Sequence, residues 1–85
     1  MDKVIKYLEW LIDDETDAIQ EIEMRERDLI SEMYRSDNFN LIKTRTNELE
    51  NLYDSEEQRR YARALLKRVL KHCERWADDD EKNNF

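Results

Sequence analysis

The stretch DKVIKYLEWLIDDETDAIQEIEMRERDLISEMYR, residues 2–35, carries an uninterrupted heptad repeat. With Ile5 at position a, seven of the nine a and d positions hold Ile, Leu or Met, at alternating steps of three and four residues. This is the pattern of a helix that buries one side. Val4, Leu11 and Ala18 occupy the flanking g position and widen that apolar side, as in the helices of a bundle. We therefore expect one long helix that packs against the rest of the chain or against a second copy.

The composition favours helices throughout the chain. Its 85 residues are 44% charged and 39% hydrophobic, and they include no glycine and no proline. A β-rich fold would lack its usual turn residues, whereas Asn, Asp and Ser can join helices. The sequence thus predicts a single all-α domain over residues 1–85, a small helical bundle or a long helical hairpin with coiled-coil-like packing. A core this small is commonly stabilised by self-association, and we expect a homodimer.

The expected helix boundaries follow from capping and turn residues. Helices are predicted over about residues 2–35, 38–53 and 55–77. Asp2 is expected to cap the first helix, and Ser36–Asn40 to form the turn after it. Ser55 and Gln58 have the spacing of a capping box and predict the start of a third helix. The alternative is one continuous helix over 38–77, because the capping box lies in a run without helix-breaking residues.

The predicted third helix has an apolar side of its own. Its members are Ala62, Leu65, Leu66, Val69, Leu70, Cys73 and Trp76. The acidic run Asp78–Glu81 follows, and clustered negative charge is unfavourable at a helix C-terminus. Residues 78–85 are therefore expected to form a frayed acidic tail.

Charge is segregated along the chain, whose formal net charge is −7. Residues 59–75 contain seven basic residues and one acidic residue. We predict an acidic face on the first helix, made of Glu9, Asp13, Asp17, Glu21, Asp28 and Glu32. We predict a basic stripe on the third helix, made of Arg59, Arg63, Lys67, Lys71 and Arg75. The preferred interpretation is that the stripe faces the Glu9–Glu21 part of the acidic face, within the chain or across a dimer.

Two acidic residues, Glu15 and Glu26, occupy core positions of the first heptad repeat. We expect them to pair with the basic stripe or to fix the register of the helices, as polar core residues do in coiled coils. The alternative is a buried acid with a raised pKa.

No catalytic, cofactor-binding or metal-binding residues are predicted. The single histidine and single cysteine are neighbours, His72 and Cys73, and their side chains diverge on a helix. The sequence has neither a glycine-rich phosphate loop nor a nucleophile turn. No apolar run approaches the roughly 20 residues that span a bilayer, and a lone cysteine does not indicate an oxidising compartment. A cytoplasmic, non-enzymatic protein is expected.

The segment Thr46–Glu50 (TNELE) resembles the Ser-Gln-x-Leu-Asp motif of small helical-hairpin phosphatases that act on sporulation response regulators. The resemblance covers this segment alone, and Leu49 is the match among the fixed positions of the motif. Glu50 stands where that family has its functional Asp, and this departure removes the basis for the family's activity in this chain.

These features predict a small acidic regulator or inhibitor, of the kind that phages and mobile elements encode. Its acidic face would occlude a basic surface of a partner protein, such as a nucleic-acid-binding surface, as DNA mimics do. Trp10, Tyr34 and Phe39 are the aromatic candidates for binding hot spots. The alternatives are a toxin-immunity protein and a structural coiled-coil adaptor. The overall negative charge disfavours direct nucleic-acid binding through the basic stripe.

Overall fold

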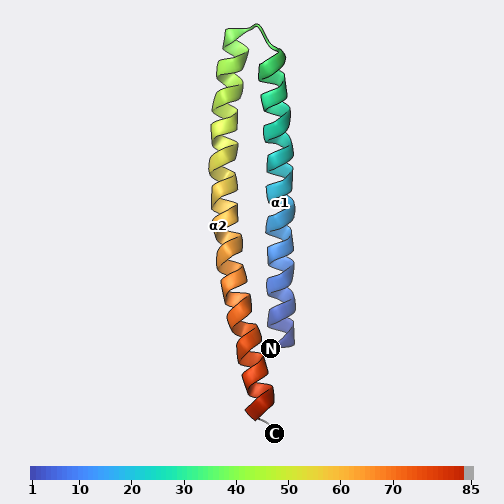
Figure 1. Cartoon of the computed structure of the whole chain (residues 1–85). Helices are drawn as coiled ribbons and strands as arrows, with labels where there is room; N and C mark the ends of the chain where they lie inside the picture. The colour runs from blue at the N-terminus through green and yellow to red at the C-terminus, as the bar shows by residue number, and fades with distance from the viewer. Residues whose placement is uncertain (84–85) are drawn as a thin grey trace.

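The chain folds into one long helical hairpin, as a computed structural model shows (Figure 1). The structure describes the backbone of residues 1–83 and the side chains of residues 1–79. Helix α1 spans Asp2–Arg35 and helix α2 spans Phe39–Asn83, and the two run antiparallel. The described residues contain no strand, which confirms the all-α prediction. The hairpin is a rod with extents of 71 × 14 × 14 Å.

Polar side chains close the turn between the helices, as the sequence predicts. The Asn38 Oδ1 accepts hydrogen bonds from the backbone N–H groups of Asn40 and Leu41, at 3.0 and 3.3 Å. Asn38 therefore caps α2 in the manner typical of a helix N-terminus. Ser36 accepts a hydrogen bond from the Asn38 N–H at its hydroxyl and donates its own N–H to the Met33 carbonyl. These bonds satisfy backbone groups that a helix end leaves free.

The predicted cap of α1 is wrong. The N-cap residue is Met1, which makes no side-chain capping bond, and Asp2 already lies in the first turn. A carboxylate in the first turn still interacts favourably with the positive end of the helix dipole. The preference for Asp2 near this end thus has a physical basis, although the residue does not act as a cap.

The predicted break after Tyr53 is also wrong, because α2 is continuous from Phe39 to Asn83. Ser55 lies inside this helix, and Glu56 of the polar run is buried against α1. The run therefore continues the helix core instead of forming a turn. The helix also passes the predicted end at residue 77, because acidic residues near a C-terminus cost only about 0.3–1 kcal/mol each. Residues 84–85 of the predicted tail lie outside the described residues.

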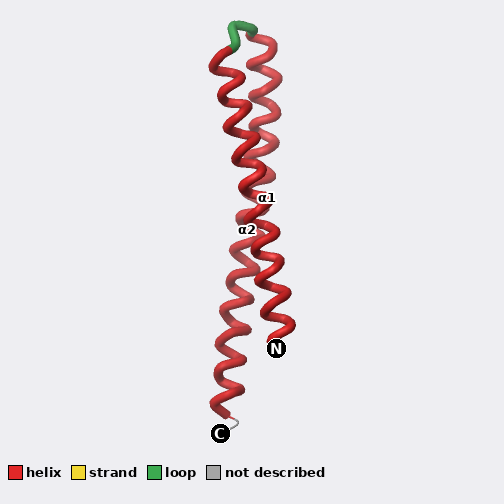
Figure 2. The backbone as a smooth tube through the Cα atoms, turned by 90° about the vertical axis from the view of Figure 1, so that its right-hand side faces the viewer, coloured by secondary structure: helices red, strands yellow, loops and turns green. Residues whose placement is uncertain are grey.

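The core is a single layer of side chains between the helices. Its buried apolar members are Leu8, Ile12, Ile19 and Leu29, all at a or d positions of α1. With Ile42 at position a, α2 supplies half-buried side chains in the same three-and-four rhythm: Ile42, Arg45, Leu49, Leu52, Arg63, Leu66, Leu70, Cys73 and Ala77. In the view of Figure 2 the helices cross, as helices with heptad repeats do when they coil around each other.

The heptad register divides the rest of the rod into two sides. Position e of one antiparallel helix lies beside position e of the other, and g lies beside g. Glu23 and Arg60 are both at e and form an ion pair, and Arg25 and Glu48 are both at g and pair at 2.9 Å. We call the two surfaces flanking the core the e side and the g side.

Two substitutions test the continuity of α2. Asn38→Ala should lower the free energy of unfolding by about 1 kcal/mol, because it removes the cap of α2. Ser55→Ala should leave that free energy within about 0.5 kcal/mol of the wild type, because Ser55 lies inside the helix. Urea unfolding followed by circular dichroism measures both changes. A loss at Ser55 as large as the loss at Asn38 would restore the capping box and the three-helix arrangement.

Candidate functional site

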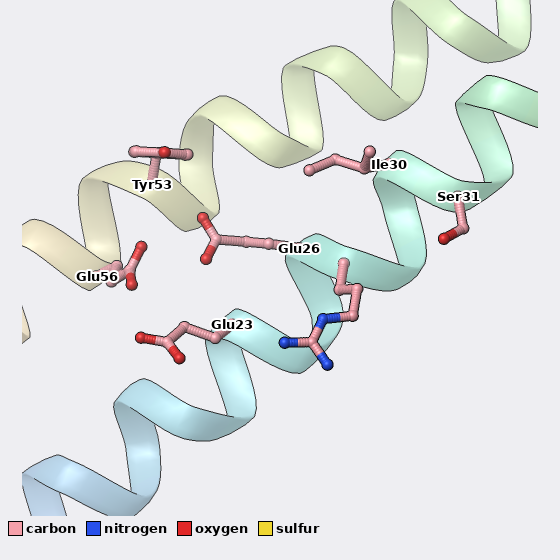
Figure 3. A pocket seen from close by; sticks show the side chains of 7 residues that line it. Glu23, Glu26, Ile30, Ser31, Tyr53 and Glu56 are labelled. Carbon is pink, nitrogen blue, oxygen red and sulfur yellow. The ribbon is translucent and has the colours of Figure 1, made fainter.

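A cluster of charged side chains lies in the middle of the rod, where an apolar core would be expected. Glu23 and Glu26 come from α1, and Glu56 and Arg60 come from the facing turns of α2. Arg60 forks onto the Glu56 Oε1 through its Nε at 3.3 Å and its Nη2 at 2.8 Å, and the same Nη2 pairs with Glu23. Figure 3 shows Glu23, Glu26 and Glu56 directed toward the same space between the helices.

Glu26 is the unsatisfied member of this cluster. The residue is 7% exposed, and its Oε2 is buried without a hydrogen-bond partner among the described residues. Burial raises the pKa of Glu26, and the nearby negative charge of Glu56 raises it further. The hydrogen bonds from Arg60 hold the pKa of Glu56 below its usual range. The cluster therefore has one carboxyl group that favours its proton and one that favours its charge.

A shallow hollow opens beside these carboxyl groups on the e side. Glu23, Glu26 and Glu56 line its wall, together with Arg27, Ile30, Ser31 and Tyr53 (Figure 3). Ile30 and Tyr53 are 52% and 56% exposed, so the hollow is lined by both apolar side chains and carboxyl groups. Chemically, this arrangement can take up and release a proton, or accept a cationic group. Within the described part of the chain, no group of three or more His, Cys, Asp and Glu side chains is placed to hold a metal ion.

The structure confirms the expected pairing for one of the two acidic core residues of α1 and not for the other. Glu15 pairs with Arg59 of the basic stripe at 3.2 Å, which confirms the prediction for that residue. Glu26 has no such partner, and its raised pKa matches the alternative interpretation instead. The difference arises because Arg60, the basic residue nearest to Glu26 along α2, is already engaged by Glu56 and Glu23.

The acidic face is exposed along α1. Of its six residues, Glu32 pairs with Arg45 at 2.9 Å. The other five make no ion pair within the described part of the chain: Glu9, Asp13, Asp17, Glu21 and Asp28. A step of four residues exceeds one helical turn by about 40°, so these carboxylates wind around the outer surface of α1. They form a broad acidic surface instead of a straight row.

The basic stripe also winds around its helix, so some of its members reach toward α1 and others lie on the outer surface. Arg59 and Arg63 reach toward α1, where Arg59 pairs with Glu15 and the Arg63 Nη1 donates to the Thr16 hydroxyl at 3.2 Å. The remaining members, Lys67, Lys71 and Arg75, are exposed. The predicted pairing between the stripe and the acidic face is not formed within the described chain, so its intramolecular form is wrong.

The aromatic candidates are exposed but lie at opposite ends of the rod. Trp10 is 59% exposed and stacks on Tyr7 at 6.1 Å between ring centroids, near the start of α1. Tyr34 and Phe39 flank the turn and are 91% and 74% exposed. The structure therefore does not bring the three candidates together. Trp10 shares the outer surface of α1 with Asp13 and Asp17, which follow it at helical spacing.

Two residues that the sequence assigned to the core are exposed. Val69 and Trp76 are 47% and 56% exposed, although they belong to the predicted apolar side of the third segment. With Ile42 at position a, both fall at position g. The same heptad count that identifies Val4 and Leu11 as flanking residues in α1 would have identified them in advance.

No described helix is both long enough and apolar enough to cross a membrane.

The pKa shifts predict a pH-dependent stability. Folding raises the pKa of Glu26. The contribution of Glu26 to the stability of the hairpin is therefore fully present below its ordinary pKa near 4.5, and it is lost as the pH rises through its pKa in the folded state. Glu26→Leu removes this loss and should stabilise the hairpin at pH 7 by about 1–3 kcal/mol, with a smaller gain at pH 4.5. Urea unfolding at the two pH values measures the difference.

Glu57→Gln, on the exposed surface of α2, is the control for that experiment. It should leave stability nearly unchanged at both pH values. Glu56 contributes to the pH dependence of stability with the opposite sign, because its stabilisation is lost as the pH falls through its lowered pKa. The hydrogen bonds from Arg60, the largest cause of that lowered pKa, are present in both wild type and Glu26→Leu. An equal gain for Glu26→Leu at both pH values would contradict the raised pKa of Glu26.

The chain matches no protein-family model, no curated protein and no solved structure. What it does must therefore be inferred from the chemistry of its own residues.

Proposed function

We propose that this chain is a small, non-enzymatic regulator that binds a partner protein through the acidic outer surface of α1. The binding covers a basic surface of the partner, of the kind that contacts nucleic acid, and so occludes it. The cytoplasm is the compartment in which such a partner would be met. The observation that carries the proposal is the set of exposed carboxylates of α1 that have no cationic partner in the described chain.

Other acidic residues of α1 do have cationic partners, and comparison with them supports the proposal. Glu15, Glu23 and Glu32 of α1 each meet an arginine of α2. Glu9, Asp13 and Asp17, on the outer surface of the same helix, do not. The seven positive charges of residues 59–75 are therefore not used to neutralise the outer surface. That surface is left with a negative potential that can attract a basic partner.

The helix also holds these carboxylates in a defined arrangement. Residues four apart on a helix are about 6 Å apart along its axis. Because α1 is held along its length by α2, little conformational freedom would be lost when a partner binds. Trp10 lies between Glu9 and Asp13 at one end of the acidic face and can serve as an apolar anchor there, since aromatic residues dominate binding energy at protein interfaces.

The charge distribution favours a protein over a nucleic acid as the partner. The chain as a whole is repelled by phosphates because its net charge is −7. Two of the five basic-stripe residues, Arg59 and Arg63, are engaged with α1, by an ion pair and a hydrogen bond. The stripe residues that α1 does not engage in the described chain are Lys67, Lys71 and Arg75, and three residues are a small footprint for backbone binding.

Capture experiments with two charge variants test the proposal. The face variant combines Glu9→Gln, Asp13→Asn, Asp17→Asn and Glu21→Gln. The control variant combines Asp37→Asn, Glu50→Gln, Asp54→Asn and Glu57→Gln, which are exposed carboxylates outside the acidic face. Both variants have the same net charge, so they separate the position of the charge from its amount. The bait is the full chain, and the extract comes from the cells that encode it.

We expect wild type and control to retain the same stoichiometric partner at low salt and to release it at high salt. The face variant should bind that partner at least about tenfold more weakly, because the carboxylates that contact it are gone. The isolated partner should carry a basic surface. Equal loss of binding in both variants would reduce the effect to net charge, and no stoichiometric partner at either salt would refute the proposal.

Gel-shift experiments test the rival function. Duplex DNA should not shift with the wild-type chain even at low salt, where phosphate contacts are strongest. A salt-dependent shift that disappears when Lys67, Lys71 and Arg75 are replaced by Ala would instead assign the basic stripe to nucleic acid.

A further inference from the structure

An apolar strip runs along the g side of the rod, over the half that contains the start of α1. Its g-position members are Val4, Leu11 and Ala18 from α1 and Ala62, Val69 and Trp76 from α2, and the adjacent c positions add Tyr7 and Leu65. Because g lies beside g in this hairpin, the two sets form one continuous surface. A hollow near the start of the rod, lined by Arg68, Val69, His72 and Cys73, belongs to the same strip.

The hairpin itself does not cover this strip. Val4 and Val69 are 49% and 47% exposed, and the aromatic residues Tyr7 and Trp76 are 60% and 56% exposed. The e side at the same level is polar, with Glu9 and Thr16 on α1 and Lys67 and Glu74 on α2. In this half of the rod, the apolar surface beside the core thus lies on the g side, whereas the exposed Ile30 and Tyr53 of the e side belong to the other half. An asymmetry of this kind is typical of an interaction surface.

The core of the hairpin gives a reason for this surface to be covered. Four apolar side chains of the described residues are buried between α1 and α2, and charged residues occupy the middle of the same layer. A single core of this size contributes little net stability, and association is a common way to extend it. Packing another pair of helices on the g side would bury the strip and turn the single layer into a bundle core.

The charges beside the strip indicate what covers it. On α1 they are acidic, with Asp14 and Glu21 at position c. On α2 they are basic, with Arg68 and Arg75 at position f and His72 at position c. One margin of the strip is therefore negative and the other positive. A surface with this pattern is complementary to itself when a copy is turned by 180° about the long axis of the rod.

We propose that a second copy of this chain covers the g-side strip, giving a parallel, two-fold symmetric dimer in which α1 of each copy packs on α2 of the other. In this arrangement the acidic margin of α1 meets the basic margin of α2 from the partner copy. The contact between Thr16 and Arg63 shows which parts of the two helices lie side by side in this half of the rod. It places Asp14 and Arg68 within about one helical turn of each other along the rod. The result is a four-helix bundle with a closed, self-complementary interface.

The reversed arrangement is disfavoured by the same charges. Turning the second copy end over end would place α1 on α1, and the acidic margins would face each other. Like charges across an interface cost free energy and suppress the wrong orientation. The proposal does not rest on the proposed function, because Glu9, Asp13 and Asp17 lie at positions e, b and f and stay outside the dimer. Glu21, at position c, is the residue of the face variant that also belongs to the acidic margin of the dimer.

Light scattering coupled to size-exclusion chromatography tests the dimer with the full chain. The wild type should show twice the mass of one 10.5 kDa chain. Val69→Glu puts a charge in the centre of the strip and should raise the dissociation constant by at least about tenfold. Ala64→Glu adds the same charge to α2 at the outer b position and should leave the mass unchanged. Tyr7→Glu provides a second disruption from α1 in case Val69→Glu loses its helical circular dichroism.

A charge exchange tests the orientation. Asp14→Arg and Arg68→Asp should each weaken the dimer, and the double variant should recover wild-type affinity, because each interface pair is then restored with its signs exchanged. A monomeric wild type, or a dimer that is indifferent to Val69→Glu and Tyr7→Glu, would overturn the proposal. A dimer broken by those variants but not restored by the double exchange would overturn the parallel arrangement.

Discussion

The register of α1 against α2 is the constraint on which the other features of the molecule depend. Both helices are amphipathic with heptad periodicity, so a slip by one heptad would keep apolar residues facing each other. The charged residues in the layer remove this ambiguity. Glu15 meets Arg59, Glu23 meets Arg60, and a slipped register would separate these pairs and leave charges buried or partly buried without partners.

Placing charged residues in the core layer lowers the stability of the hairpin, and the central cluster is the example. Exposed ion pairs contribute little free energy, and the pair of Arg60 with Glu23 is about half exposed, whereas Glu56 in the second Arg60 pair is buried. Glu26 is the more costly residue, since its Oε2 is buried without a hydrogen-bond partner among the described residues and burial raises the pKa of its carboxyl group. A leucine at position 26 would make a better core. The middle of the rod is thus the place where pairing specificity is obtained at the expense of packing.

Most of the fold is predictable from the heptad repeat of residues 2–35 and from the absence of glycine and proline. The first helix has the predicted bounds, and the turn lies where Ser36 and Asn38 suggest. The break predicted from the capping-box spacing of Ser55 and Gln58 is absent, because this spacing occurs here inside a helix. In heptad terms, Glu56 and Arg59 occupy core positions, and the helix continues through them.

The arrangement of the candidate site is harder to predict from the sequence than the fold, for a related reason. Residues four apart do not form a straight row, because four residues exceed one helical turn, so both charged sets wind around their helices. Arg59 and Arg63 consequently belong to the core contact and Lys67 to the surface. The state of Glu26 depends on how Arg60 distributes its hydrogen bonds in three dimensions, and no spacing rule contains that information.

The rod shape described above also governs how the protein moves in solution. The radius of gyration is 19.7 Å, whereas a compact domain of this length would have about 12 Å. An elongated particle tumbles slowly about its short axes and experiences more friction than a sphere of equal mass. On a column calibrated with globular standards, a single chain would therefore elute early, at the position of a substantially heavier protein.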